Sequence, residues 1–265
     1  MLARKSLGQH FLLDSTITDQ IVLYAGNLKD CNVIEIGPGP GGLTRSLLNA
    51  GAKKLFVIEK DDRCIAIVEQ LKELAEGRLE IIHGDALDID LLTAVPAPRK
   101  VVANLPYNVG TAMLIKWLNA IYSGKEAFES LTLMFQKEVA LRITADHGNK
   151  DYGRLSVLCQ WLCDCRYDFD LPPYAFTPPP KVSSAVVTLT PRPKPLADVS
   201  KEALETILAK AFGQRRKMLR SALKGLAVPA DELLKKAGID GTLRAEQLDV
   251  ATLGRLAKIY KNCKE

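Results

Sequence analysis

The chain has 265 residues, of which 47% are hydrophobic and 25% charged, and its net charge is +5. This length and composition are typical of a globular protein with one full α/β core and a small further unit, and they exclude a low-complexity chain. The mild basic excess permits a nucleic-acid partner without requiring one. Since neither an apolar run of membrane-spanning length nor an apolar signal core is present, we expect no membrane association and a cytoplasmic location.

Apolar runs alternate with helical stretches through the first two thirds of the chain. This βαβα alternation predicts a mostly parallel sheet with helices on both faces. The predicted strands are residues 32–36, 54–59, 79–83, 100–104 and 131–136, and the predicted helices are residues 42–49, 62–74, 111–121 and 138–144.

Two further predicted strands, residues 166–171 and 184–189, flank a proline-rich stretch and are expected to close the sheet edge as an antiparallel pair. Residues 191–195 read as a stiff connector, and the pattern becomes helical from residue 201. The predicted fold class is therefore α/β: a Rossmann-like sheet, mostly parallel with an antiparallel edge, and a small C-terminal helical domain. We place the domain boundary between residues 1–192 and residues 193–265.

A glycine-rich turn, Gly37-Pro38-Gly39-Pro40-Gly41-Gly42, follows the strand 32–36. It matches the G-x-G-x-x-G pattern, and Glu59 ends the next strand, where an acid can meet a ribose. This pair fits a dinucleotide-binding enzyme as well as a methyltransferase, and a turn without a ligand is the third possibility. Asp85 favours S-adenosylmethionine over NAD, because its carboxylate, just past the third strand, can accept a hydrogen bond from the amino group of an adenine.

The segment Asn104-Leu105-Pro106-Tyr107 follows the predicted strand 100–104 and is the most informative part of the chain. Asn104 offers a side-chain acceptor, the Leu105–Pro106 segment offers a backbone carbonyl, and Tyr107 offers a flat face for a base. Such a group at a strand end is suited to gripping an exocyclic amino group. It resembles the site of methyltransferases that act on adenine or cytosine; the alternative for Tyr107 is packing in the core.

Several motifs together resemble the small-subunit ribosomal RNA adenine dimethyltransferases, the bacterial KsgA/RsmA family. They span nearly the whole chain: residues 5–12, 36–39, 58–61, 84–86, 104–108, 176–182 and 212–219. The resemblance implies an S-adenosylmethionine-dependent enzyme that dimethylates the 6-amino groups of adenines. It further implies two adjacent adenines in a loop near the 3′ end of small-subunit rRNA, the small ribosomal subunit as partner, and a role in its biogenesis.

The same resemblance implies roles for individual residues around the cofactor. Gly37 is expected under the methionine part, Glu59 on the ribose hydroxyls and Asp85 on the cofactor adenine. Asn104 is expected near both the methyl donor and the target amine. The remaining expected cofactor contacts are His10, Leu12, Gly39, Lys60 and Ala86. Two positions depart from the family pattern, because His10 replaces a common Asn and Gly110 replaces a common Ser.

The residues expected to contact RNA lie in two places. Phe176, in the proline-rich loop, is expected to cover the face of the base opposite Tyr107, with a purely packing role as the alternative. A solvated helix face is the alternative for the basic residues, which lie in a predicted helical stretch and for which we favour phosphate contacts. These are Arg215, Arg216, Lys217, Arg220 and Lys224, to which Arg4 and Lys5 could add.

Other readings of the sequence remain open. Cys159, Cys163 and Cys165 lie close together, but we expect buried free thiols and no metal site. The functional alternatives are a large-subunit rRNA adenine methyltransferase of the antibiotic-resistance type, an NAD-dependent oxidoreductase, and a ribosome-assembly factor with secondary methylation. We expect a monomer, since no heptad or long apolar edge is evident.

Overall fold

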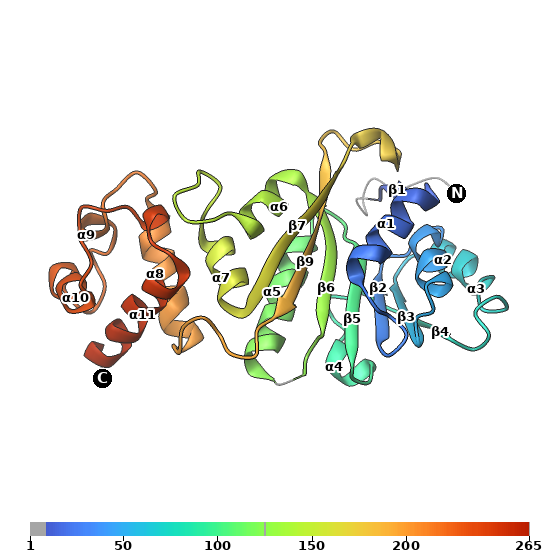
Figure 1. The fold of residues 1–265 in the computed structure, drawn as a ribbon, viewed down its shortest axis with the longest axis horizontal. Helices are drawn as coiled ribbons and strands as arrows, with labels where there is room; N and C mark the ends of the chain where they lie inside the picture. The colour runs from blue at the N-terminus through green and yellow to red at the C-terminus, as the bar shows by residue number, and fades with distance from the viewer. Residues whose placement is uncertain (1–8, 125, 265) are drawn as a thin grey trace. The chain divides into compact units, whose positions relative to one another are not determined.

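The computed structural model describes residues 9–124 and 126–264 and divides the chain into two compact units (Figure 1). The first unit comprises residues 1–140 and 165–191, and the second comprises residues 141–164 and 192–265. Residues 141–164, which the sequence analysis assigned to the first domain, thus group with the C-terminal part. We expect S-adenosylmethionine binding and catalysis in residues 1–192, with an N-terminal segment that covers the cofactor, and RNA or ribosome binding in residues 193–265; these roles remain predictions. Arg4 and Lys5 lie outside the described residues.

The first unit is built on one seven-stranded sheet. Its strands are β2 (Asn32–Ile36), β3 (Lys54–Glu59), β4 (Leu79–His83), β5 (Arg99–Asn104), β6 (Ser130–Gln136), β7 (Cys163–Leu171) and β9 (Ser184–Pro191). Their order is β4-β3-β2-β5-β6-β9-β7, with parallel pairing from β4 to β6 and antiparallel pairing of β6 with β9. The prediction of a mostly parallel sheet with an antiparallel edge is confirmed.

The helices of this part are α1 (Ser15–Ala25), α2 (Gly42–Asn49), α3 (Asp62–Glu69), α4 (Leu91–Ala94), α5 (Gly110–Ser123) and α6 (Lys137–Thr144). The sequence analysis did not predict α1, which starts where the Asp14 side chain accepts a hydrogen bond from the Thr16 N–H at 2.9 Å. It also extended α3 to residue 74. The helix ends at Glu69 because turns occupy residues 70–77, where Glu76 and Gly77 have positive φ angles.

A short second sheet fixes the N-terminal segment to the proline-rich loop. Strand β1 (Phe11–Leu12) pairs antiparallel with β8 (Phe176–Thr177), and Leu12 lies opposite Phe176. Leu12 and Phe176 are 5% and 2% exposed and belong to the hydrophobic core that also holds Val33 and Val102. The first unit thus anchors the segment that follows residue 8 by both hydrogen bonding and burial.

The second unit is helical, as predicted. Its elements are α7 (Arg154–Leu162), α8 (Lys201–Gly213), α9 (Leu219–Ala222), α10 (Ala230–Ala237), a short 3-10 helix (Ala245–Gln247) and α11 (Val250–Lys264). Helix α11 packs against α7, α8 and α10. Trp161 on α7 is 1% exposed and donates a hydrogen bond to the Ala197 carbonyl at 2.8 Å, which ties the chain after residue 192 to this unit.

The cysteines are all free thiols. Cys31, Cys64, Cys159 and Cys163 are buried as predicted, whereas Cys165 and Cys263 are only partly buried. Within residues 9–124 and 126–264, no group of three or more His, Cys, Asp or Glu side chains is placed to hold a metal ion. None of the helices in that part of the chain has the length and apolar character needed to cross a bilayer.

Gly42 allows β1 to lie against the start of α2. A Cβ atom at Gly42 would come within 2.4 Å of the Leu12 carbonyl oxygen. We therefore expect Gly42→Ala to lower the free energy of unfolding by about 1–3 kcal/mol, because the backbone of β1 must shift. Urea unfolding measures this loss. Gly213→Ala is the control, since no atom of the described residues is found within 4 Å of its added Cβ. An unchanged free energy of unfolding in Gly42→Ala would contradict the tight contact.

Candidate active site

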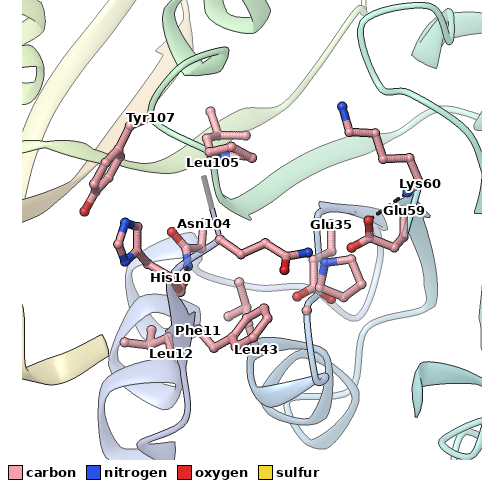
Figure 2. Close-up of a pocket in the computed structure, with 15 residues that line it drawn as sticks. His10, Phe11, Leu12, Glu35, Leu43, Glu59, Lys60, Asn104, Leu105 and Tyr107 are labelled. Carbon is pink, nitrogen blue, oxygen red and sulfur yellow. Dashed lines mark hydrogen bonds between the residues drawn. The ribbon is translucent and has the colours of Figure 1, made fainter. Parts of the chain in front are cut away.

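A pocket lies at the carboxyl ends of β2, β3 and β5, where open α/β sheets bind their ligands (Figure 2). It combines the glycine-rich turn, the end of β3, the segment after β5 and the N-terminal segment. Its lining residues are Gln9, His10, Phe11, Leu12, Glu35, Gly37, Pro38, Gly39, Leu43, Glu59, Lys60, Asn104, Leu105, Pro106 and Tyr107. Four parts of the sequence that were predicted separately therefore meet at one site.

The glycine-rich turn needs glycine for two reasons. Gly37 and Gly39 have φ angles of 65° and 55°, which residues with a side chain rarely adopt. A Cβ at Gly39 would also lie 2.7 Å from Cδ1 of Phe11, whereas none of the described atoms lies within 4 Å of an added Cβ at Gly37. The turn thus brings bare backbone to the pocket at Gly37 and makes room for Phe11 at Gly39.

Glu59 presents a fixed carboxylate at the end of β3. It is 7% exposed, and its Oε1 accepts hydrogen bonds from the backbone N–H groups of Lys60 at 2.7 Å and Asp61 at 2.8 Å. Burial raises the pKa of Glu59, while these N–H groups oppose the rise by favouring the charged form. The carboxylate is therefore oriented before any ligand arrives.

Asp85, which was expected at the cofactor adenine, and Ala86, another expected cofactor contact, do not line the pocket. The Leu87 N–H, at 3.0 Å, and the Lys60 ammonium, at 2.9 Å, both bind Asp85 and lower the pKa of its carboxyl group. Lys116 on α5 donates to the carbonyl of Ile89 at 2.7 Å and so anchors the loop that follows. Lys60 itself lines the pocket and links it to Asp85. The adenine contact of Asp85 and the cofactor contact of Ala86 remain predictions.

Asn104 has its amide group oriented by the N-terminal segment. Its Nδ2 donates to the His10 carbonyl at 3.0 Å, which leaves Oδ1 as an acceptor in the pocket. The Pro106 carbonyl already accepts the N–H groups of Val109 at 3.1 Å and Gly110 at 3.0 Å, at the start of α5. The Leu105 carbonyl is therefore a better candidate than the Pro106 carbonyl to accept a second hydrogen bond, beside the one to Asn104 Oδ1.

Tyr107 lines the pocket next to His10 rather than lying in the core (Figure 2). The two rings stack with centroids 5.6 Å apart and an interplanar angle of 30°. The Tyr107 hydroxyl bonds to Ser184 Oγ, and His10 Nδ1 donates to the Pro178 carbonyl at 2.8 Å. Because a carbonyl only accepts, Nδ1 carries the proton and a neutral His10 keeps Nε2 as an acceptor.

Phe176 does not reach the pocket. Its side chain is 2% exposed and packs in the hydrophobic core, while its backbone pairs with Leu12. In this structure Phe176 has the packing role that was the alternative prediction, because an aromatic side chain so buried has no face left for a base. We therefore remove Phe176 from the residues assigned to the target adenine.

Several residues that line the pocket were not predicted from the sequence: Gln9, Phe11, Glu35, Pro38 and Leu43. Glu35 is the most informative of them. It is 1% exposed, accepts a hydrogen bond from Thr44 Oγ1 at 2.7 Å, and burial raises its pKa to about 8. An acid among the apolar residues Val33, Ile34 and Ile36 of β2 was the signal that could have found it, since buried carboxyl groups with shifted pKa values gather at functional sites.

The basic residues of the second unit have different environments. Arg215 Nη2 donates to the carbonyls of Lys150 at 2.6 Å and Tyr152 at 3.0 Å, so it holds the chain together within this unit. Arg216, Lys217, Arg220 and Lys224 are exposed, as is Arg215 itself. The predicted helical stretch is wrong, because α8 ends at Gly213, and a turn separates it from the four-residue helix α9.

Comparisons with known proteins agree on one family. The profile described as "Ribosomal RNA adenine dimethylase" matches residues 1–262. "Ribosomal RNA small subunit methyltransferase A" of Rhodospirillum rubrum is 54% identical over 97% of this chain and 87% of its own length. The protein of the same name from a Ruegeria species is 53% identical over 97% of this chain and 91% of its own length.

Solved structures agree with this result. A dimethyladenosine transferase from Plasmodium falciparum superposes with a TM-score of 0.80 at 28% identity, over 93% of this chain and 96% of that one. The 23S rRNA methyltransferase ErmE superposes with a TM-score of 0.71 at 26% identity, over 95% of this chain and 99% of that one. The α/β fold is thus shared with a dimethyladenosine transferase and with a 23S rRNA methyltransferase.

The raised pKa of Glu35 has a consequence for stability. Between its ordinary value of 4.5 and about 8, the unfolded chain loses the Glu35 proton while the folded chain keeps it. The free energy of unfolding should therefore fall with rising pH in this window, by up to about 1.4 kcal/mol per pH unit from this group. Glu35→Gln removes this contribution, because Gln does not titrate. Urea unfolding of both proteins across the window measures the difference, and parallel pH curves would refute it.

Proposed function

We propose that this chain, which belongs to the ribosomal RNA adenine dimethylase family, transfers methyl groups from S-adenosylmethionine to the 6-amino groups of adenines in small-subunit rRNA. The observation that carries the proposal is Asn104. Its amide is oriented by the His10 carbonyl, and it lines the same pocket as Gly37 and Glu59. A cofactor site and an amine-gripping group therefore share one cavity.

The lining residues fit S-adenosylmethionine by their chemistry. The bare backbone at Gly37 leaves space for the methionine part, and the Glu59 carboxylate can accept hydrogen bonds from the ribose hydroxyls. Phe11, Leu12 and Leu43 supply apolar walls. When bound, the cofactor supplies a methyl carbon on a positively charged sulfur, and the protein supplies position and electrostatics.

The target amine needs orientation because its lone pair is delocalised into the adenine ring. Hydrogen bonds from its two N–H groups to Asn104 Oδ1 and the Leu105 carbonyl would favour a more pyramidal nitrogen and aim its lone pair. Orientation of this kind can contribute about 7–11 kcal/mol in favourable cases. No general base is required, since the methylated nitrogen is acidic and loses its proton readily.

Tyr107 is the proposed stacking surface for the target base. His10 already covers one of its faces, so an entering adenine takes the opposite face or displaces the His10 ring. The base must leave its own stack to enter the pocket, and a loop or single-stranded adenine costs least to flip. These constraints favour a loop substrate over a duplex.

The choice of ribosomal subunit rests on the relatives. Proteins that are 50–54% identical to this chain carry the small-subunit name, whereas ErmE, a 23S rRNA methyltransferase, is 26% identical. We therefore propose the small subunit and its rRNA as partner, two adjacent adenines near the 3′ end as target, and a cytoplasmic monomer that acts during subunit biogenesis.

Asn104→Ala tests the catalytic assignment. We expect it to abolish methyl transfer, because the variant loses both the acceptor for the amine and the bond to His10. The assay incubates the protein with S-adenosylmethionine and small subunits from cells that lack the modification. Mass spectrometry of the digested RNA then detects dimethyladenosine.

Asn104→Asp is the matched control, since it keeps a side-chain acceptor but cannot donate to the His10 carbonyl, and it should retain partial activity. Full activity of Asn104→Ala would refute the assignment. Methylation of large but not small subunits by the unaltered protein would redirect the proposal to the large-subunit alternative. Loss of methylation with intact subunit binding and assembly support would separate an assembly role from catalysis.

The exposed basic residues of the second unit test the RNA contact. Replacing Arg216 and Lys217 together by Ala should weaken binding to the subunit and reduce the slope of log K against log salt by about 2, since two phosphate contacts are lost. Binding titrations at several salt concentrations measure the slope. Lys29→Ala/Lys53→Ala removes two exposed charges from the first unit as a control; the same slope in all three proteins would contradict the assignment.

A further inference from the structure

The proline-rich loop displays an aromatic side chain that the site described above does not use. Tyr174 is 85% exposed, the largest exposed fraction of any large hydrophobic side chain in the described part of the chain. Val182, in the same loop, is 46% exposed, and Leu13, directly after β1, is 56% exposed. Strand β1, which Leu13 follows, pairs with β8, which follows Tyr174, so the exposed apolar side chains lie on two paired segments.

The backbone that carries Tyr174 is well anchored. Tyr174 lies in a short 3-10 helix (Pro173–Ala175), where the Ala175 N–H donates to the Pro172 carbonyl at 3.0 Å. Two residues later, Phe176 is buried in the core and paired with Leu12. A fixed backbone segment therefore holds the Tyr174 ring in solvent. Because that backbone is already ordered, little further conformational entropy is lost when a ligand binds to the ring.

Tyr174 also lies close to the pocket along the chain. The Pro178 carbonyl accepts the hydrogen bond from His10, which lines the pocket and stacks on Tyr107. Tyr174 and Pro178 are four positions apart in the chain, and a fully extended chain of that length spans at most about 14 Å. A nucleic-acid strand whose adenine stacks on Tyr107 would pass this loop.

We propose that Tyr174 stacks on a nucleotide beside the target adenine and holds the neighbouring strand while that adenine occupies the pocket. The inference rests on the proposed function. A flipped adenine leaves its neighbour without a stacking partner, and an exposed aromatic ring replaces that partner for any base. Residues 172–183 contain Lys181 and no acidic residue, so the charge of this segment suits a phosphate backbone.

The test compares Tyr174→Ala, Tyr174→Phe and the control Leu74→Ala, which truncates a side chain that is 73% exposed in the turn after α3. The substrates are S-adenosylmethionine and unmethylated small subunits. We expect Tyr174→Ala to raise KM for the subunit about 5- to 100-fold with little change in kcat, and Tyr174→Phe and Leu74→Ala to match the unaltered protein. Calorimetry should show unchanged S-adenosylmethionine affinity in all variants.

A second measurement locates the contact. Ultraviolet irradiation of the complex, followed by digestion and mass spectrometry, should yield a nucleotide adduct on the peptide that contains Tyr174, next to the methylated adenine. An adduct to a ribosomal protein instead would overturn the inference. So would an unchanged KM in Tyr174→Ala, a loss in Tyr174→Phe as large as in Tyr174→Ala, or weakened cofactor binding. Absence of methylation by the unaltered protein would refute the proposed function itself and would be seen first.

Discussion

The hydrogen bond from Asn104 to the His10 carbonyl joins residues 94 positions apart, and the pocket depends on it. It sets which atom of the Asn104 amide faces the cavity. The pairing of β1 with β8 holds the same N-terminal segment from its other side, and the bond from His10 to Pro178 adds a third connection. These hydrogen bonds therefore hold the segment after residue 8, the end of β5 and the proline-rich loop together, although the central sheet alone brings only one of them to this edge.

The pocket also contains two acidic side chains at buried positions, where loss of solvent disfavours the charged form. Glu35 and Glu59 are both buried, and desolvation raises the pKa of each. The hydrogen bonds that oppose this rise in pKa differ between the two acids. Several backbone N–H groups donate to Glu59, whereas the Thr44 hydroxyl donates to Glu35. An apolar residue at position 35 would suit the strand better on stability grounds. The presence of Glu35 in the cavity wall fits the rule that residues which lower stability locally are found at functional sites.

The central sheet was predictable because each of its parallel strands is a short apolar run between turn residues. The bounds of β2, β3 and β4 match the predicted ranges. β2 and β3 are buried along nearly their whole length, and such strands need little beyond local composition to be recognised. Helices α1 and α7 were missed because their local sequence alone is not enough to identify them. In α7, nine residues with mixed polar and apolar character do not show a clear period, and the helix is stabilised by packing against other elements of its unit.

The site residues also differ in whether the local sequence was enough to place them. Residue type and position after a strand were enough to place Gly37, Glu59 and Asn104 at the cavity, because the carboxyl ends of parallel strands share one edge. They were not enough for Asp85 or Phe176, whose places depend on partners distant in sequence. Lys60 and the Leu87 N–H bind the Asp85 carboxylate, and the pairing with Leu12 carries Phe176 into the core. Arg215 follows the same logic, since the carbonyls of Lys150 and Tyr152 make it a structural cation. A motif thus predicts which groups gather at a site, but the competing intramolecular partners decide which of them remain available to a ligand.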